Sequence, residues 1–223
     1  METDDLISEL PLTVTEIRGQ KKNQNRFSLY HHKRFLIGVS SKTLTDFSLQ
    51  KGVNLTPSLY QKLITSENRF AAREKAFQYL SRRDHASFEL KQKLLKKGFP
   101  SETIDSVIMD LSDKNLISDH IFAEKFATDK ANLNNWGPKK IETALFKKGV
   151  AKKIIQETLK NTFDNLSQTH ICVDLIHKRK KHFLREKDPY RRKGKIFQYL
   201  AGRGFSGSDI KKAIAQSGLT END

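Results

Sequence analysis

The sequence predicts a mainly α-helical protein: a tandem array of three three-helix repeats forming an elongated curved rod, preceded by a small N-terminal β-hairpin or meander plus a helical segment. Three observations support this fold class. A glycine-centred apolar pattern occurs three times, short segments before residue 40 alternate between polar and apolar residues, and only 36% of the 223 residues are hydrophobic while 30% are charged. This composition suits several small cores, because a rod has more surface per residue than a sphere.

The repeat becomes visible when the chain is aligned on Gly98, Gly149 and Gly204, which are 51 and 55 residues apart. Apolar residues then occupy the same five positions, eight and four residues before each glycine and one, six and ten residues after it. These residues are Leu90, Leu94, Phe99, Ile104 and Ile108 in the first unit, Ile141, Leu145, Val150, Ile155 and Leu159 in the second, and Ile196, Leu200, Phe205, Ile210 and Ile214 in the third. A match of this length in three places indicates a true internal repeat.

Each feature of the repeat has a physical cause. Apolar residues four apart lie on one face of a helix, so an amphipathic helix is predicted before each glycine. The glycine is predicted to end that helix in the left-handed conformation, which costs least in a residue without a Cβ atom. A second helix then starts near Ser101 and Ser206, which are suitable N-caps, with Asp209 at the capping-box position.

A further helix precedes each pair and completes the three-helix unit. These helices are expected over residues 69–83, 118–133 and 169–184, and the third is expected to be longer and more basic. The units are expected over residues 67–117, 118–165 and 166–217, followed by a flexible tail over 218–223. No isolated unit of this size buries much core, so neighbouring units are expected to stack.

The lead segment has a different pattern. Residues 1–11 are interpreted as a flexible acidic tail, and residues 12–66 as a small β-containing segment with one or two helices. Strands are predicted over 12–17, 26–30 and 35–39, with a polar turn over 19–25 and helices over 41–49 and 56–65. Thr56 is the predicted N-cap of the second helix, with Pro57 at its first position.

The charge of the chain indicates an acidic partner. The formal net charge is +15, which favours nucleic acid or a nucleoprotein. Between Lys178 and Lys195 there are ten Lys or Arg and two acids, a net charge of +8 and more than half of the total. The candidate filament- or nucleic-acid-binding residues in and after this cluster are Lys178, Arg179, Lys180, Lys181, Arg185, Arg191, Arg192, Lys193, Lys195 and Arg203. The alternative interpretation is a solvated face that keeps the rod soluble.

Two weaker basic sets belong to the first and second units. The first set is Arg82, Arg83, Lys91, Lys93, Lys96 and Lys97, and the second is Lys139, Lys140, Lys147 and Lys148. Ordinary helix-surface cations explain both sets equally well. Lys139 and Lys140 stand at a predicted helix N-terminus, where free N–H groups also favour anions. Nearby, Trp136 could anchor a partner or cover the joint between two repeats, and the joint is favoured.

Several functional classes find no support in the motifs. The chain has no GxxxxGK[ST] phosphate loop and no HExxH zinc motif, so we expect no enzyme, no cofactor and no metal. Cys172 is the only cysteine, which excludes an internal disulfide, and it is predicted to be a core residue. No apolar run is long enough to span a membrane and the N-terminus is acidic, so a cytoplasmic protein without membrane contact is expected.

The repeats resemble those of the RecX family of recombinase regulators over about residues 69–217. The resemblance is carried in the first unit by Ala76, residues 79–83, Ser87, Glu89, Leu90, Leu94 and residues 97–99. In the second unit it is carried by Leu116, Ile117, Asp119, Phe122, Ala123, Phe126, residues 136–141, Leu145 and residues 148–150, and in the third by Lys195, Leu200, residues 203–205 and Ile210. The basic stretch around residues 179–181 departs from the family pattern.

The resemblance implies a non-catalytic regulatory protein. It implies binding within the groove of a RecA–DNA filament, which interferes with strand exchange, ATP hydrolysis and co-protease activity. We therefore expect a monomer in bacterial DNA repair and the SOS response, whose partners are a RecA-type recombinase filament and single- or double-stranded DNA without sequence specificity. The alternative is an autonomous basic helical DNA-binding protein that has no recombinase partner. A DNA nuclease is disfavoured because the sequence lacks the motifs of such enzymes.

Overall fold

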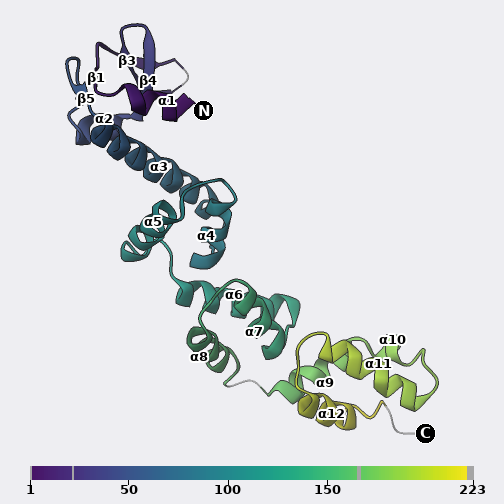
Figure 1. The fold of residues 1–223 in the computed structure, drawn as a ribbon. Coiled ribbons are helices and arrows are strands. Elements are labelled where there is room, and N and C mark those ends of the chain that lie inside the picture. The colour runs from purple at the N-terminus through teal and green to yellow at the C-terminus, as the bar shows by residue number, and fades with distance from the viewer. Residues whose placement is uncertain (1, 22, 165–166, 220–223) are drawn as a thin grey trace. The chain divides into compact units, whose positions relative to one another are not determined.

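The computed structural model describes residues 2–21, 23–164 and 167–219 (Figure 1). It is mainly helical, with a small β region near the N-terminus, as predicted. The chain divides into two compact units, one made of residues 1–83 and 91–113 and the other of residues 84–90 and 114–223. Each unit has its own packing and is described separately.

The β region consists of a three-stranded antiparallel meander and a separate strand pair. The meander has the order β2 (Glu16–Gln20), β3 (Asn23–His31) and β4 (Arg34–Ser40), and the pair joins β1 (Leu12–Thr13) to β5 (Asn54–Leu55). The predicted strand over 12–17 is therefore divided between two sheets. The change occurs where Val14 N–H donates to Val53 O at 2.8 Å and Thr15 N–H donates to Tyr30 O at 2.8 Å.

The N-terminal residues contribute to the core of this region. Residues Glu2–Glu9 form helix α1, and Leu6 and Leu10 are buried beside Leu29, Val39 and other apolar side chains. The expectation of a flexible tail over residues 1–11 is therefore wrong for α1 and Leu10, because burial of the two leucines holds these residues against the core of the β region. At the other end of the chain, the predicted tail over 218–223 lies outside the described residues from 220 onward, and Leu219 is buried.

A single long helix replaces two predicted ones. After the short helix α2 (Ser41–Asp46), α3 runs from Pro57 to Leu80 without interruption. Thr56 caps α3 by accepting from Leu59 N–H, as predicted. The predicted gap at residues 66–68 is helical because no glycine or proline interrupts it. Glu67, inside that gap, accepts from Ser40 N–H at 2.7 Å and lies 2.9 Å from Arg26, so it holds α3 against the meander.

The three repeats contain the predicted helix pairs. They are α4 (Ser87–Leu95) with α5 (Ser101–Asp113), α7 (Pro138–Lys147) with α8 (Lys152–Phe163), and α11 (Pro189–Ala201) with α12 (Gly207–Gln216). The preceding helices are the C-terminal part of α3, then α6 (Asp119–Asn134), then α9 (Gln168–Lys178). The three turn glycines have φ values of +83°, +77° and +91°, which confirms the left-handed conformation.

The apolar positions of the repeat form the cores. The positions eight and four residues before each glycine and six after it are buried in all three repeats. A further buried position lies nine residues after the glycine, and its residues are Val107, Thr158 and Ala213. Sequence analysis did not find this position because one of its residues is a threonine.

The third repeat corrects the prediction of a longer leading helix. Helix α9 ends at Lys178, Arg179 adopts φ −111° and ψ 14°, and a separate short helix α10 spans Lys180–Phe183. The break allows Phe183 to become almost fully buried, with its ring centroid 5.7 Å from that of Tyr199. The extra residues of this repeat therefore form α10 and the turn before α11.

The second and third repeats meet through direct backbone contact within one unit. Gly137 N–H donates to Arg203 O at 2.7 Å, and Lys139 N–H donates to Gly204 O at 3.1 Å. A Cβ atom on Gly137 would lie 2.7 Å from the carbonyl carbon of Gly204, and one on Gly204 would collide with the backbone of Lys140. Only glycine at both positions allows this approach.

Arg192 ties together the segments that flank α11. Its Nε donates to Glu186 O at 2.9 Å, its Nη1 to Leu219 O at 2.6 Å and its Nη2 to Lys187 O at 3.2 Å. The side chain therefore joins the turn after α10 to the end of the described chain.

Glycine substitutions should separate backbone strain from close approach. Gly98→Ala adds strain at positive φ in open space, so it should lower the free energy of unfolding by about 1 kcal/mol. Gly137→Ala adds only the collision and Gly204→Ala adds both, so the latter should cost about 3 kcal/mol or more. Urea unfolding followed by circular dichroism measures these losses. A neutral Gly137→Ala substitution would contradict the backbone contact.

Arg192→Gln should destabilise the third repeat by about 2 kcal/mol, because three carbonyl groups lose a charged donor. The adjacent Lys193→Gln is the matched control, since Lys193 is exposed and has no partner among the described residues, and it should change stability by less than about 0.5 kcal/mol. Thermal unfolding of both variants tests this. Equal losses for the two substitutions would show that the carbonyl contacts contribute nothing.

Cys172 should be inert in the folded protein. Burial, assisted by the charge of Asp209, raises the pKa of the thiol to about 12, above its ordinary value of 9.0. The thiolate is the reactive form, so at pH 9 a thiol reagent should label unfolded protein rapidly and folded protein only as it opens. The same raised pKa means that this thiol favours the folded state below pH 9 and that this contribution falls as the pH rises toward 12. Labelling at a rate independent of added urea would argue against burial.

Candidate nucleic-acid interface

A site that neutralises phosphates needs cationic side chains that the protein itself does not already neutralise. The predicted basic residues are therefore distinguished by their partners. Those held by carboxylates, carbonyl groups or rings stabilise the fold, and the remainder can contact a ligand.

The two acids of the cluster between Lys178 and Lys195 are both engaged. Glu186 Oε2 accepts from Lys195 Nζ at 2.6 Å, and this hydrogen bond lowers the pKa of Glu186. Asp188 caps α11 by accepting from Tyr190 N–H at 2.8 Å and lies 3.6 Å from Arg191 Nε. Lys195 and Arg191 are thus the cluster's local counter-charges.

Other predicted cations in this region have structural roles. Arg192 is held by three carbonyl groups, as described above. Arg179 and Arg203 lie with their guanidinium carbons 4.7 and 4.9 Å from the ring centroid of Tyr199. Arg203 also donates from Nη1 to the carbonyl group of Asn134, which lies in the preceding repeat. These contacts fix the third repeat and its joint with the second.

Five predicted cations of the cluster remain available. Each is exposed, and the side chain of each has no ion pair, hydrogen bond or ring contact within the described part of the chain; they are Lys178, Lys180, Lys181, Arg185 and Lys193. The first four belong to the segment around the break between α9 and α10. This segment is the densest group of unneutralised charge in the third repeat.

In the weaker set of the first repeat, Lys91 pairs with Asp105 and Lys93 Nζ lies 4.9 Å from the ring centroid of Tyr79, so both have partners within the protein. The other four residues of the set lie at two chain turns. Arg82 follows the end of α3 and is exposed, and Arg83 beside it makes contacts within the protein. Lys96 and Lys97 are exposed in the turn that ends at Gly98, and neither has a partner within residues 2–21, 23–164 and 167–219. Their position at the C-terminal end of α4 is favourable because the helix dipole is negative there.

In the second repeat, two of the four lysines of the set have side-chain partners and two do not. Lys148 Nζ lies 3.1 Å from Glu89 and within 5.6 Å of the ring centroids of Phe122 and Phe126, so it stabilises packing. Lys140 Nζ donates to Gly202 O at 3.0 Å and lies 4.7 Å from the ring centroid of Trp136. Lys139 and Lys147 are exposed, and their ammonium groups have no partner in the described structure.

The prediction of free N–H groups at the start of α7 is wrong. The amide groups of Gly137 and Lys139 donate to the carbonyl groups of Arg203 and Gly204, so the next repeat occupies this helix end. Trp136 lies at the same joint, as sequence analysis favoured. Its ring packs edge-on against Phe126, with 6.4 Å between the centroids.

A hollow of about 450 Å³ lies at this joint, and sequence analysis did not find it. It is lined by Trp136, Lys139, Lys140, Thr143, Ala144, Lys147, Ala201, Gly202 and Gly204. No charge pattern could reveal it, because its two walls are about sixty residues apart in the sequence and meet only in the folded chain, through the glycine contact and the hydrogen bonds beside it.

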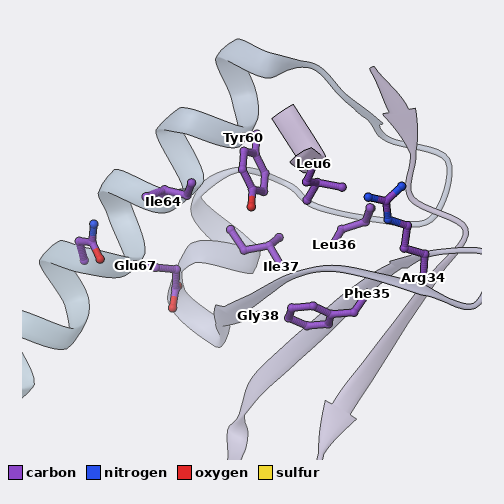
Figure 2. A pocket seen from close by; sticks show the side chains of 10 residues that line it. Leu6, Arg34, Phe35, Leu36, Ile37, Gly38, Tyr60, Ile64 and Glu67 are labelled. Carbon is purple, nitrogen blue, oxygen red and sulfur yellow. The ribbon is translucent and has the colours of Figure 1, made fainter. Parts of the chain in front are cut away.

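A larger hollow, about 600 Å³, lies between β4, α1 and α3, and its chemistry is different (Figure 2). Its lining is mainly apolar, with Leu36, Ile37 and Ile64 around the buried Tyr60, whose pKa is raised by burial. The carboxylate of Glu67 at its edge is held by Ser40 and Arg26. A pocket of this kind does not suit a polyanion.

Among the described residues, no group of three or more His, Cys, Asp or Glu side chains could hold a metal ion. None of the helices there combines the length and the apolar character that crossing a membrane requires.

Comparison with known proteins identifies the family. Models of the RecX family match four segments in order: the regulatory protein RecX N-terminal domain at residues 12–56, and the first, second and third three-helix domains at 72–111, 118–159 and 170–214. The regulatory protein RecX of Pelodictyon phaeoclathratiforme is 36% identical over 151 residues, which cover 68% of this chain and 91% of that protein. That of Clostridioides difficile is 29% identical over 201 residues, or 90% and 93% of the two chains.

Solved structures agree with these matches. A crystal structure of regulatory protein RecX superimposes with a TM-score of 0.72 at 24% identity, over 90% of this chain and 98% of the other. RecX from Lactobacillus salivarius gives a TM-score of 0.62 at 28% identity, over 69% and 99%. With all four family domains in order and this identity to its relatives, the chain belongs to the RecX family of regulatory proteins.

Proposed function

We propose that this protein regulates a RecA-type recombinase, mainly as an inhibitor, by binding in the groove of the recombinase–DNA filament. The observation that carries the proposal is the group of five unneutralised cations in the third repeat, in a chain whose relatives are named regulatory proteins. A filament on DNA presents phosphates along a groove. Cations without internal partners can release the counterions of those phosphates on binding.

The proposed mechanism is steric and electrostatic. Long-range attraction between the basic third repeat and the filament speeds association. Once the helical repeats occupy the groove, a second DNA strand and protein substrates of the recombinase are excluded from it, so strand exchange and co-protease activity fall. The chain needs no cofactor for this action, and one copy of it acts as a monomer.

Cosedimentation with a recombinase–single-stranded DNA filament tests the proposal, with ATP hydrolysis followed in parallel. The protein should sediment with the filament, and ATP hydrolysis should fall in proportion to the amount bound. Unchanged ATP hydrolysis and strand exchange at saturating occupancy would rule the proposal out.

Charge substitutions test the role of the third repeat. Replacing Lys178, Lys180, Lys181, Arg185 and Lys193 by glutamine should slow association with the filament about 10-fold at low salt and flatten its salt dependence. The control replaces five other exposed lysines without described partners, Lys152, Lys153, Lys160, Lys211 and Lys212, and removes the same charge. Stopped-flow measurements on both variants compare the rates. An equal effect in both would show that net charge alone matters.

The second candidate function is autonomous DNA binding, which the exposed lysines at the joint of the second and third repeats favour. It predicts tight binding to naked DNA with a steep salt dependence. Anisotropy of a labelled oligonucleotide at low salt measures this affinity, and no detectable binding there would exclude it.

A further inference from the structure

We infer that the hollow at the joint of the second and third repeats is a binding site for the phosphodiester backbone of single-stranded nucleic acid. This inference rests on the proposed function, because contact with nucleic acid is part of it, and it goes further by naming the site and its ligand.

The electrostatics of the hollow favour an anion. Three lysines line it, and no carboxylate is among the lining residues. The ammonium groups of Lys139 and Lys147 have no partner among the described residues, so their charges are available to a ligand. Lys140 uses one of its three ammonium donors on Gly202 O, which leaves two donors for a ligand.

The geometry of the site is held in place before a ligand arrives. The Lys140 ammonium group is fixed between the Trp136 ring, 4.7 Å away, and the carbonyl group of Gly202. Lys130 lies 5.3 Å from the same ring centroid, so the indole is held by two cations. Little side-chain ordering is therefore needed at Lys140 when a phosphate binds, which favours affinity.

The spacing of the available lysines suits an extended chain of phosphates. Lys139, Thr143 and Lys147 are four residues apart and share one face of α7. The outer two are separated by about 12 Å along the helix axis, since each residue rises 1.5 Å. A single phosphate ion cannot contact both ends of such a row, whereas successive phosphates of one strand can.

The remaining lining residues favour a single strand without sequence preference. Trp136 is half-buried and supplies the aromatic surface that single-strand sites combine with a basic groove. Ala144, Ala201, Gly202 and Gly204 leave room instead of filling the space. The lining has no Asn, Gln, Arg, Asp or Glu side chain, so most of the groups that read base edges are missing from it.

The tryptophan provides a direct test, because it is the only one in the chain. Titrating the full-length protein with a thymidine oligonucleotide at low salt should change the Trp136 emission saturably, at the same concentrations at which anisotropy shows the labelled oligonucleotide to bind. Binding by anisotropy without any change in emission would overturn the inference.

Matched variants locate the contact. Lys139→Gln combined with Lys147→Gln should weaken oligonucleotide binding about 10-fold and reduce the slope of log affinity against log salt by about 1.4, at about 0.7 for each single-strand phosphate contact. Lys152→Gln combined with Lys153→Gln removes the same charge from exposed positions of the same repeat, and should leave the Trp136 signal in place. An equal loss in both pairs contradicts the site.

Two further ligands define its chemistry. Inorganic phosphate that saturates the emission change as effectively as the oligonucleotide overturns the strand assignment, and so does duplex DNA that binds as tightly. Filament cosedimentation of the wild-type protein separates the two proposals. If the wild-type protein binds the filament but its Trp136 emission does not change on addition of the oligonucleotide, the site is wrong while the proposed function stands.

Discussion

The close backbone contact between Gly137 and Gly204 is the constraint on which the functional half of this structure depends. Two backbone segments of the chain approach each other without intervening side chains. Two hydrogen bonds join the start of α7 to the turn of the third repeat. This contact orients α7, places Trp136 at the joint and creates the hollow beside the lysines. The third repeat thus completes the second, so neither can be altered at this point without the other.

Net charge is a poor guide to the interface, because many of the cations hold the fold together. At the joint, Arg203 holds the backbone before Gly137, and at the other end of α7, Lys148 pairs with Glu89. In the third repeat, the guanidinium group of Arg192 donates hydrogen bonds to three carbonyl groups, and these bonds stabilise a unit whose apolar core is small. A small helical repeat has little apolar core, so part of its positive charge is used for stability and only the rest is available to a partner.

Much of the fold could be predicted from the sequence, because it depends on local rules. The glycine turns, the N-cap at Thr56 and three of the buried positions of each repeat follow from helix periodicity and capping. The break at Arg179 could not be predicted in this way, because it depends on burial of Phe183, a tertiary effect that overrides the local pattern. The continuity of α3 agrees with its local sequence, which has no glycine or proline at residues 66–68, and the contacts of Glu67 with Ser40 and Arg26 add support that the sequence does not show.

The candidate site was predictable only in outline. Residue counts locate the basic cluster but do not show which of its cations have partners. Glu186 pairs with Lys195 and Asp188 with Arg191 only because the fold brings these side chains together. Lys139 and Lys147 were predicted from their charge, and the structure contradicts the additional argument that Lys139 lies beside free N–H groups at a helix end. Their availability follows instead from the absence of any acid in the hollow that they line.

Helix α3 also constrains how this chain can change over time. It is one uninterrupted helix of 24 residues, about 36 Å long, with the β region attached at its start and α5 packed near its end. Inserting or deleting one residue within it would rotate one attachment relative to the other by about 100° and shift it by about 1.5 Å. Substitutions along the exposed face of α3 preserve these contacts, whereas a change in its length would misalign the contacts of either the β region or α5. The length of α3 should therefore vary far less among homologues than its composition.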